Sequence, residues 1–174
     1  VANYTFTWSV PAYDAFSHFL ETMPYKDLLE ITVIFAPLVV HALIGIYIVA
    51  TGSCNVGSYR YMRNWRYLFQ RITGVIAFAF LLWHVIGLKW GVSLLPDGST
   101  FELVRSVVAN PWGLAAFAIG VYSCLYHFIN GLWTFCITWG ITITPRSQQI
   151  TSWICFALFV VGAVFVAQMI VCLI

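Results

Sequence analysis

The segment LLEITVIFAPLVVHALIGIYIVAT, residues 28–51, places a histidine, His41, in the middle of a long apolar stretch. Glu30, near its start, is the one charged side chain in the segment. A helix rises about 1.5 Å per residue, so this segment is long enough to cross the roughly 30 Å of hydrocarbon in a bilayer. An ionisable side chain at that depth costs a few kcal/mol and is rarely present without a function. We therefore expect a membrane-spanning helix whose histidine binds something inside the protein.

Three further stretches are long and apolar enough to span a bilayer. The four expected spans are Leu28–Thr51, Trp65–Trp90, Trp112–Ile141 and Ile150–Ile174. Tryptophan and tyrosine gather at their ends, as in the aromatic belts of membrane proteins. The sequence thus predicts an all-α integral membrane protein, a transmembrane helical bundle with four spans in residues 28–174. Residues 1–27 are expected to form an extracytoplasmic interfacial segment with a short helix.

The composition excludes several classes of protein. Hydrophobic residues make up 61% of the chain and charged residues only 8%, whereas a soluble domain carries roughly 25% charged residues. The formal net charge of +2 comes from basic residues too few to bind nucleic acid. Five cysteines form neither a CxxC pair nor a CxxCH motif, so an iron–sulfur cluster, a zinc site and a covalent heme are all unsupported.

Basic residues set the expected orientation. Arginines cluster in the two loops on one side of the predicted bundle: Arg60, Arg63, Arg66, Arg71 and Arg146. The opposite side has only Lys26, Lys89 and Arg105. Because cytoplasmic loops carry the excess of lysine and arginine, we expect the arginine-rich loops to face the cytoplasm.

Helical rise places two of the buried histidines at one level. His41 lies about 15 Å, and His127 about 18 Å, from the arginine-rich end of its helix, and the two helices run in the same direction. His84 lies near the other end, at a level roughly 10 Å away. A flat macrocycle whose iron takes one imidazole from each side would fit between His41 and His127. The sequence therefore predicts a b-type heme with these two ligands and leaves His84 as a ligand without a partner.

A glycine follows each of these three histidines by about one helical turn: Gly45, Gly131 and Gly87. Bare backbone beside a ligand gives a flat ring room to approach the helix. Close packing between helices explains a single glycine equally well. The repetition beside all three histidines favours heme binding.

Other polar residues are candidates with two interpretations each. Arg71 and Thr73 would bind a heme propionate or a quinone carbonyl, or Arg71 simply reaches the interface. Trp133 would donate its indole N–H to a propionate or fill the bundle. Gln168 is expected to pack between helices. His18, in the segment before the first span, is expected at the surface.

Four motifs resemble one known family. They are AFSHFLETMPYKDLLE (Ala15–Glu30), HALIGIYI (His41–Ile48), YRYMRNWRYLFQRITG (Tyr59–Gly74) and HFINGLWTFCITWGITITPRSQ (His127–Gln148). Together they resemble the membrane-anchor cytochrome b subunit of bacterial succinate:menaquinone oxidoreductase (succinate dehydrogenase/fumarate reductase), of the diheme single-chain type. The resemblance covers nearly the whole chain.

The resemblance implies five membrane helices and two hemes b, each held by two histidines on different helices. By position, His41 and His127 match the ligands of the heme nearer the cytoplasm, and His84 matches one ligand of the outer heme. The remaining ligand of the family lies near the end of its first helix, a few residues before the point that matches Val1. We expect that this chain is incomplete and that the missing first helix supplies that ligand.

The resemblance also implies partners and an electron path. An iron–sulfur subunit would dock on the arginine-rich face and carry a flavoprotein subunit that oxidises succinate. Electrons would then pass through the inner and outer hemes to menaquinone. The chain would be a subunit of an enzyme in the bacterial cytoplasmic membrane, with no succinate chemistry of its own.

Three alternatives to this function remain open. One is a purely structural anchor that has lost heme, in which the histidines could be replaced without a spectral effect. The anchor of another respiratory oxidoreductase, such as a formate dehydrogenase, hydrogenase or nitrate reductase, also carries histidines on membrane helices. A transporter that relays protons through histidines would need a polar track along its path. The expected spans contain few polar residues around the histidines, which disfavours transport.

Overall fold

The structure is a computed structural model that describes residues 9–91 and 100–174. Within these residues every regular element is a helix. The elements in chain order are α1 (Val10–Glu21), α2 (Lys26–Leu29), the π-helical turn η2 (Glu30–Phe35), α3 (Ala36–Thr51), α4 (Met62–Gly91), α5 (Thr100–Val108), α6 (Pro111–Thr138) and α7 (Pro145–Leu173).

Four helices of the described residues are long and apolar enough to cross a membrane. They run over Lys26–Thr51, Met62–Gly87, Pro111–Thr138 and Pro145–Leu173. The four predicted spans are therefore confirmed, with ends that differ by a few residues. The ends differ because capping, rather than hydrophobicity, sets where a helix stops.

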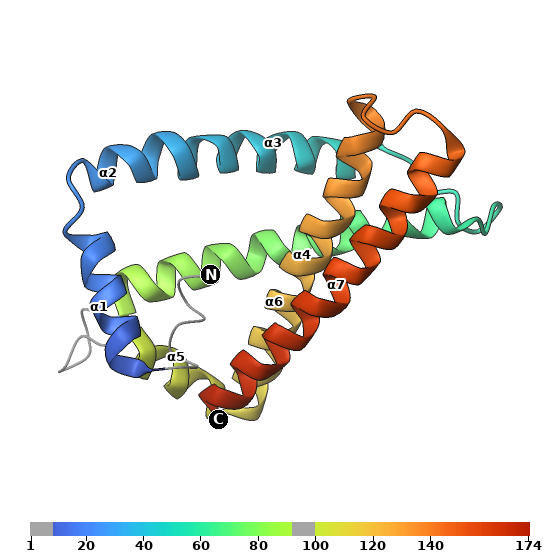
Figure 1. Ribbon diagram of the computed structural model, residues 1–174. Coiled ribbons are helices and arrows are strands. Elements are labelled where there is room, and N and C mark those ends of the chain that lie inside the picture. The colour runs from blue at the N-terminus through green and yellow to red at the C-terminus, as the bar shows by residue number, and fades with distance from the viewer. Residues whose placement is uncertain (1–8, 92–99) are drawn as a thin grey trace.

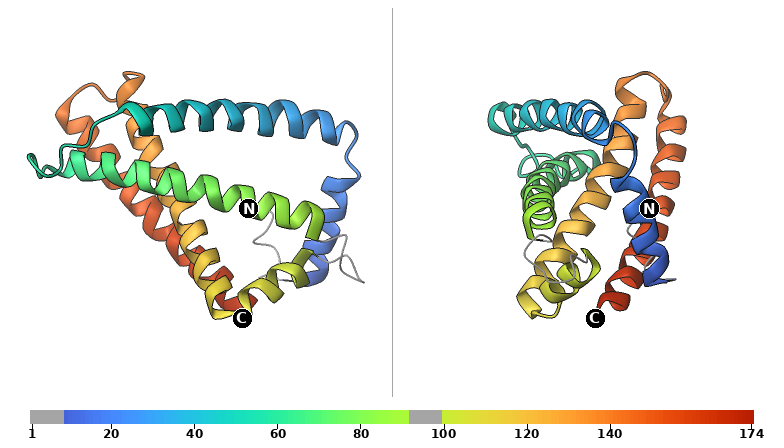
Figure 2. Two further views of the ribbon diagram at one scale, coloured as in Figure 1. Left: turned by 180° about the vertical axis from the view of Figure 1, so that it is seen from behind. Right: turned by 90° about the vertical axis from the view of Figure 1, so that its left-hand side faces the viewer.

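The spans are arranged as two antiparallel pairs. Helices α3 and α4 run side by side in opposite directions, and the α6–α7 pair crosses them obliquely (Figure 1). Views from behind and from the side show the same arrangement, with α6 lying against α4 (Figure 2). The loops that join α3 to α4 and α6 to α7 lie at one end of the molecule, as the order of the spans requires.

The first span is continuous although it contains a proline. Helices α2 and α3 join through η2, where the backbone N–H of Ala36 donates to the carbonyl of Ile31. Pro37 follows directly; it has no N–H, and its ring crowds the carbonyl four residues earlier. A single wider turn beside a proline is one way for a helix to accept it without breaking.

A tight turn links the last two spans. Helix α6 ends in a Schellman motif, with Gly140 at a φ of 68° and the N–H of Ile141 donating to the carbonyl of Cys136 over 2.9 Å. Helix α7 begins with a capping box in which the Thr144 side chain and Ser147 bond each other's backbone N–H. These two caps fix the end of the bundle to which the sequence assigns the arginine-rich loops.

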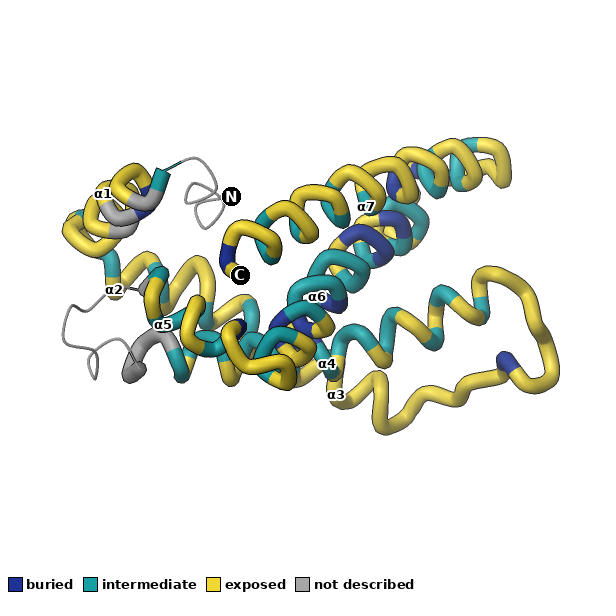
Figure 3. Tube along the Cα trace, turned by 90° about the horizontal axis from the view of Figure 1, so that it is seen from below, coloured by how far each residue is buried: buried dark blue, intermediate teal, exposed yellow. Residues whose placement is uncertain are grey.

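Among the described residues, the buried clusters are formed by α5, α6 and α7, with more buried residues on α6 than on any other helix. One buried cluster contains Val108, Phe117 and Leu173, and the other contains Ile129, Trp133 and Cys155. No residue of α2, η2 or α3 is buried, and Figure 3 shows the first span exposed along its length. Apolar side chains on such a surface suit contact with lipid or another apolar partner rather than water.

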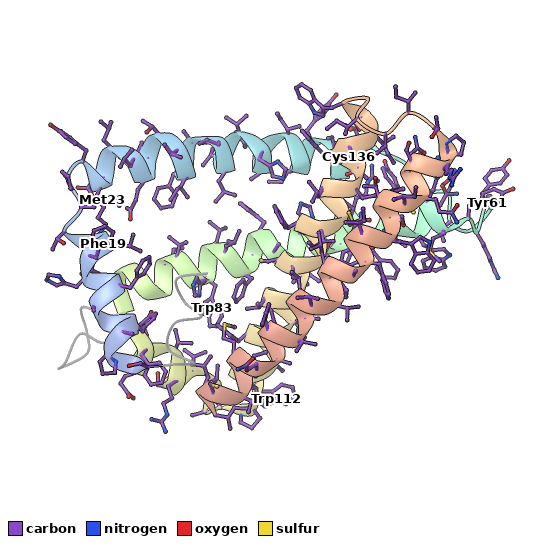
Figure 4. All side chains as sticks on the ribbon, viewed as in Figure 1. Phe19, Met23, Tyr61, Trp83, Trp112 and Cys136 are labelled. Carbon is purple, nitrogen blue, oxygen red and sulfur yellow. The ribbon has the colours of Figure 1, made fainter. Side chains whose placement is uncertain are left out.

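Aromatic side chains mark both ends of the bundle. Tyr61, in the loop between α3 and α4, and Trp112, at the start of α6, lie at opposite ends of the molecule (Figure 4). Both are largely exposed, at 70% and 84%. This placement is that of an aromatic belt at two membrane interfaces.

Helix α1 precedes the bundle and runs across its end (Figure 1). Its exposed apolar side chains include Phe16, Phe19 and Leu20. Residues 1–8 lie outside the described residues. The extracytoplasmic, interfacial position of residues 1–27 stays a prediction.

Candidate functional site

The rings of His41 on α3 and His127 on α6 lie next to each other. Their centroids are 6.0 Å apart, and the ring planes are nearly perpendicular, at 84°. His41 is exposed and His127 is half-buried. Equal depth in two helices that run the same way brings the rings together, although the helices that carry them are far apart in the sequence.

Helix α4 fixes the orientation of the His127 ring. Nδ1 of His127 lies 3.0 Å from the main-chain carbonyl oxygen of Gln70, which can only accept a hydrogen bond. Nδ1 therefore carries the proton, and Nε2 is left with its lone pair available. Histidines that bind metals in proteins almost always donate their other ring N–H in this way.

The side chain of Gln70 ties the same two helices together a second time. Its Nε2 donates to the carbonyl of His127 over 3.0 Å, and its Oε1 accepts from Nδ2 of Asn130 over 2.7 Å. Asn130 is only 3% exposed. This amide pair, half-buried at Gln70 and buried at Asn130, thus holds the backbone at the histidine, and the Gln70 main chain holds the ring.

A glycine on α4 lets the His127 ring approach closely. A Cβ atom on Gly74 would lie 2.8 Å from Cε1 and 3.1 Å from Nδ1 of His127. Carbon atoms in contact prefer about 3.5–4.0 Å, so a larger residue at this position would displace the ring. Gly74 lies four residues after Gln70, on the same face of α4.

The glycines expected beside the histidines have different surroundings. A Cβ atom on Gly45 or on Gly87 would meet nothing within 4 Å, so the helix face beside each of these two is open. A Cβ atom on Gly131 would lie 3.3 Å from Nε2 of Gln70. Gly131 therefore gives room to the Gln70 amide, whereas Gly45 and Gly87 leave space that a ligand would fill.

The His41–His127 pair fits a heme iron. Two imidazoles that bind one metal from opposite sides place their ring centroids about 6 Å apart, because each metal–nitrogen bond is about 2 Å long. The observed separation of 6.0 Å matches this value. A metal held by protein alone needs three or four ligands, and the described residues contain no such group of histidine, cysteine and acidic side chains. Two imidazoles alone suit a metal whose other ligands come from a macrocycle.

His84 lies apart from this pair. It is ten residues beyond Gly74 on α4, which corresponds to about 15 Å along the helix. Its ring stacks on Phe80, with centroids 5.4 Å apart and planes at 22°. The half-buried ring lines a small pocket of about 60 Å³ with Trp83, Gly87 and residues of α5 and α6. The structure therefore separates the three histidines into a pair and a single residue at another level.

Arg71 makes its contacts with the end of α3. Its guanidinium donates to the carbonyls of Gly52 over 2.9 Å and Ile48 over 3.0 Å, bonds the hydroxyl of Tyr67 and stacks on that ring. A cation at the carboxyl end of a helix satisfies free carbonyls and complements the helix dipole. The Thr73 hydroxyl donates to the carbonyl of Phe69 in its own helix. A propionate or quinone role for Arg71 and Thr73 stays a prediction.

Trp133 links α6 to α4 and α7. Its indole N–H donates to the carbonyl of Gln148 over 3.1 Å, and the guanidinium of Arg66 lies 4.1 Å above its ring. Trp133 is 6% exposed. In the structure its polar atom is thus used inside the bundle, and its role toward a propionate stays a prediction.

Five arginines lie at one end of the molecule, in the α3–α4 loop and near the starts of α4 and α7. We call this end the arginine face: Arg60, Arg63, Arg66, Arg71 and Arg146. Arg63 donates to the side chain of Gln148 and Arg66 to that of Ser152, so two of them also join α4 to α7. The side chains of Arg60 and Arg146 are exposed. This face therefore carries exposed positive charge.

Two remaining candidates lie elsewhere. His18 is exposed on α1, and Gln168 is exposed on α7. The residues that sequence reasoning missed are Gln70, Gly74 and Asn130. Their signal was present as two amides and a glycine inside apolar helices, but only the packing of α4 on α6 shows that all three surround His127.

Comparison with known proteins adds a family relationship. Residues 53–166 match the family described as "Succinate dehydrogenase/Fumarate reductase transmembrane subunit". This range includes His84 and His127 and begins after His41. The chain is also 40% identical over 149 residues to the succinate dehydrogenase cytochrome b558 subunit of Bacillus subtilis (strain 168), covering 86% of this chain and 73% of that relative. No solved structure matches the chain.

Proposed function

Because this chain belongs to the succinate dehydrogenase/fumarate reductase transmembrane subunit family, we propose that it binds heme b through His41 and His127 and passes electrons to menaquinone. As a membrane-anchor cytochrome b, it is a subunit of an enzyme complex. The oxidation of succinate belongs to a flavoprotein subunit, and an iron–sulfur subunit delivers the electrons to this chain. The path of the electrons and these two partners are part of the proposal.

The observation that carries the proposal is the paired rings of His41 and His127, 6.0 Å apart. His127 offers Nε2 because its Nδ1–H is held by Gln70, and His41 faces it from a helix whose side chains are not buried. A heme bound here would supply one-electron redox chemistry. With His41 and His127 both holding its iron, the group would favour electron transfer over oxygen binding.

His84 is proposed as one ligand of a second heme, further from the arginine face. Its ring is oriented by stacking on Phe80, and the open backbone of Gly87 lies beside it in the same pocket. A second ligand for this heme is not assigned to a described residue. Two hemes at different depths would extend the electron path across the membrane.

The arginine face is proposed to face the cytoplasm and to bind the iron–sulfur subunit. Arg60 in the α3–α4 loop and Arg146 in the first turn of α7 are exposed, and an excess of basic residues is typical of the cytoplasmic side of a membrane protein. Arg63 and Arg66 are held by Gln148 and Ser152, so the face has a defined shape. Positive charge there would steer an acidic partner surface toward the membrane.

Reduction of the heme by succinate tests this function. The purified complex is oxidised under anaerobic conditions, succinate is added, and the heme b absorption bands are recorded before and after addition of a menaquinone analogue. We expect succinate to reduce heme b and the quinone to reoxidise it, while fumarate in place of succinate leaves the heme oxidised. Reduced flavin and clusters beside fully oxidised heme b would contradict the proposal.

A further inference from the structure

We infer that a short stretch of α4, from Gln70 to Gly74, positions both histidines of the inner heme site, an inference that rests on the proposed heme function. None of these residues is a ligand. They act through His127 on α6 and through the end of α3, which carries His41. Their effect would be to set the basicity of one ligand and the position of both.

Gln70 controls His127 through two separate bonds. Its main-chain carbonyl accepts the Nδ1–H of the ring, and its side-chain Nε2 donates to the His127 carbonyl, each over 3.0 Å. The first bond fixes the tautomer and makes Nε2 more basic. The second bond holds the His127 backbone, from which the ring extends. The ring and the backbone of His127 are therefore fixed to the same residue of α4.

Asn130 keeps the Gln70 amide in this orientation. Its Nδ2 donates to Oε1 of Gln70 over 2.7 Å, which requires that Nε2 of Gln70 point toward His127. Asn130 is almost fully buried, and its bond to Gln70 lies in a low-dielectric interior, where a hydrogen bond is electrostatically stronger than in water. The Gln70–Asn130 amide pair therefore helps to position the proposed iron ligand, His127.

Gly74 sets the distance of the ring from α4. The Cβ atom of an alanine would lie 2.8 Å from Cε1 and 3.1 Å from Nδ1 of His127. The ring would have to move away from α4, and the bond between Nδ1 and the Gln70 carbonyl would lengthen. Gly74 is thus required for the hydrogen bond that Gln70 accepts.

Arg71, the residue next to Gln70, holds the other helix. Its bonds to the carbonyls of Ile48 and Gly52 fix the end of α3, two turns beyond His41. These bonds matter because no residue of α3 is buried, so packing alone holds the helix weakly. Adjacent residues of α4 thus face the two helices that carry the ligands.

The test uses the intact complex and four single variants. Gly74→Ala moves the ring, and Gln70→Met removes the amide while keeping side-chain length. Gly162→Ala is the matched control, because its Cβ would meet only the flexible end of Leu125 on α6. His127→Ala removes the proposed ligand. Heme b per chain, the heme midpoint potentials and the low-spin ferric EPR signal are measured for each.

We expect His127→Ala to lose the inner heme, whereas Gly74→Ala keeps it with a higher midpoint potential, because the lengthened Nδ1 bond leaves the imidazole less basic and ferric iron less stabilised. For Gly74→Ala the ratio of oxidised to reduced heme at the wild-type midpoint should fall about tenfold, equivalent to about 59 mV for one electron. Gln70→Met keeps the main-chain carbonyl that accepts from Nδ1, so it should act by freeing the His127 backbone, with a changed EPR signal and a smaller rise in potential. The EPR signal should change in both variants, and Gly162→Ala should match the wild type. If the Gly74→Ala complex does not assemble, the EPR signal and midpoint potential of Gln70→Met decide whether this stretch of α4 positions His127.

Two other results have separate meanings. Wild-type potentials and EPR signals in Gly74→Ala and Gln70→Met, with the inner heme lost in His127→Ala, would overturn the positioning role alone. Both hemes retained in His127→Ala would instead overturn the proposed heme site on which the inference rests.

Discussion

The main-chain carbonyl of Gln70 lies 3.0 Å from Nδ1 of His127, so a residue of α4 fixes the ring that α6 presents to His41. The two helices meet here through polar contacts inside an otherwise apolar bundle. Such contacts are weak on average between membrane helices, roughly 0.6 kcal/mol each, so orientation is their more important effect. The predictions below separate orientation from stability.

Removing Asn130 should loosen the α4–α6 contact. In Asn130→Leu, Oε1 of Gln70 loses the donor that lies 2.7 Å away and is left unpaired, at a cost of about 1–3 kcal/mol. Adding Gln70→Met removes the unpaired group, so the double variant should be less destabilised than the sum of the single variants. Thermal unfolding of the complex, followed through heme absorption, measures the stability of the two single variants and of the double variant. Additive losses would show that the amides are not coupled.

Arg71 should stabilise the end of α3. In Arg71→Met the carbonyls of Ile48 and Gly52 lose a charged donor, and we expect a loss of about 2 kcal/mol. Arg71→Lys keeps the charge but not the paired donors, so its stability should lie between that of the wild type and that of Arg71→Met. Protease cleavage in the α3–α4 loop of detergent-solubilised complex would report release of the helix end. Arg105→Lys, on an exposed side chain of α5, is the control.

Trp133 should affect stability more than heme properties. Trp133→Phe loses the hydrogen bond to the Gln148 carbonyl but keeps an aromatic ring near Arg66, and we expect a cost of about 1 kcal/mol. Heme content and midpoint potentials should stay at wild-type values. A shifted inner-heme potential with unchanged thermal stability would instead favour a bond from Trp133 to a propionate.

Substitutions near Phe80 should change the midpoint potential of the outer heme and leave that of the inner heme unchanged. The ring of Phe80 occupies the space that a side chain on Gly120 would need, and the same ring stacks on His84. Gly120→Ala should therefore cost about 1–3 kcal/mol by overpacking and shift the potential of the His84 heme. A redox titration that resolves two hemes checks this, with Gly162→Ala as the control. A shift confined to the inner heme would contradict the assignment of His84 to a separate site.

The sequence predicts the structural features that depend on one helix at a time. The four spans follow from hydrophobic length, and the shared level of His41 and His127 follows from helical rise. The roles of Gln70, Gly74 and Asn130 depend on how α4 is rotated against α6, which residue spacing within one helix does not contain. The same holds for Arg71, whose partners are the last carbonyls of a different helix. Gly131 illustrates the limit, because its neighbour is the Gln70 amide on α4.

The central claim is that His41 and His127 bind the same heme iron. Heme b per chain, measured in purified complexes of His41→Ala, His127→Ala and the double variant, tests it most directly, with His18→Ala as the control. We expect each single variant and the double variant to lack the same one heme, and His18→Ala to retain the wild-type content. A double variant that lacks twice as much heme as either single variant, or single variants with unchanged content, would contradict the claim.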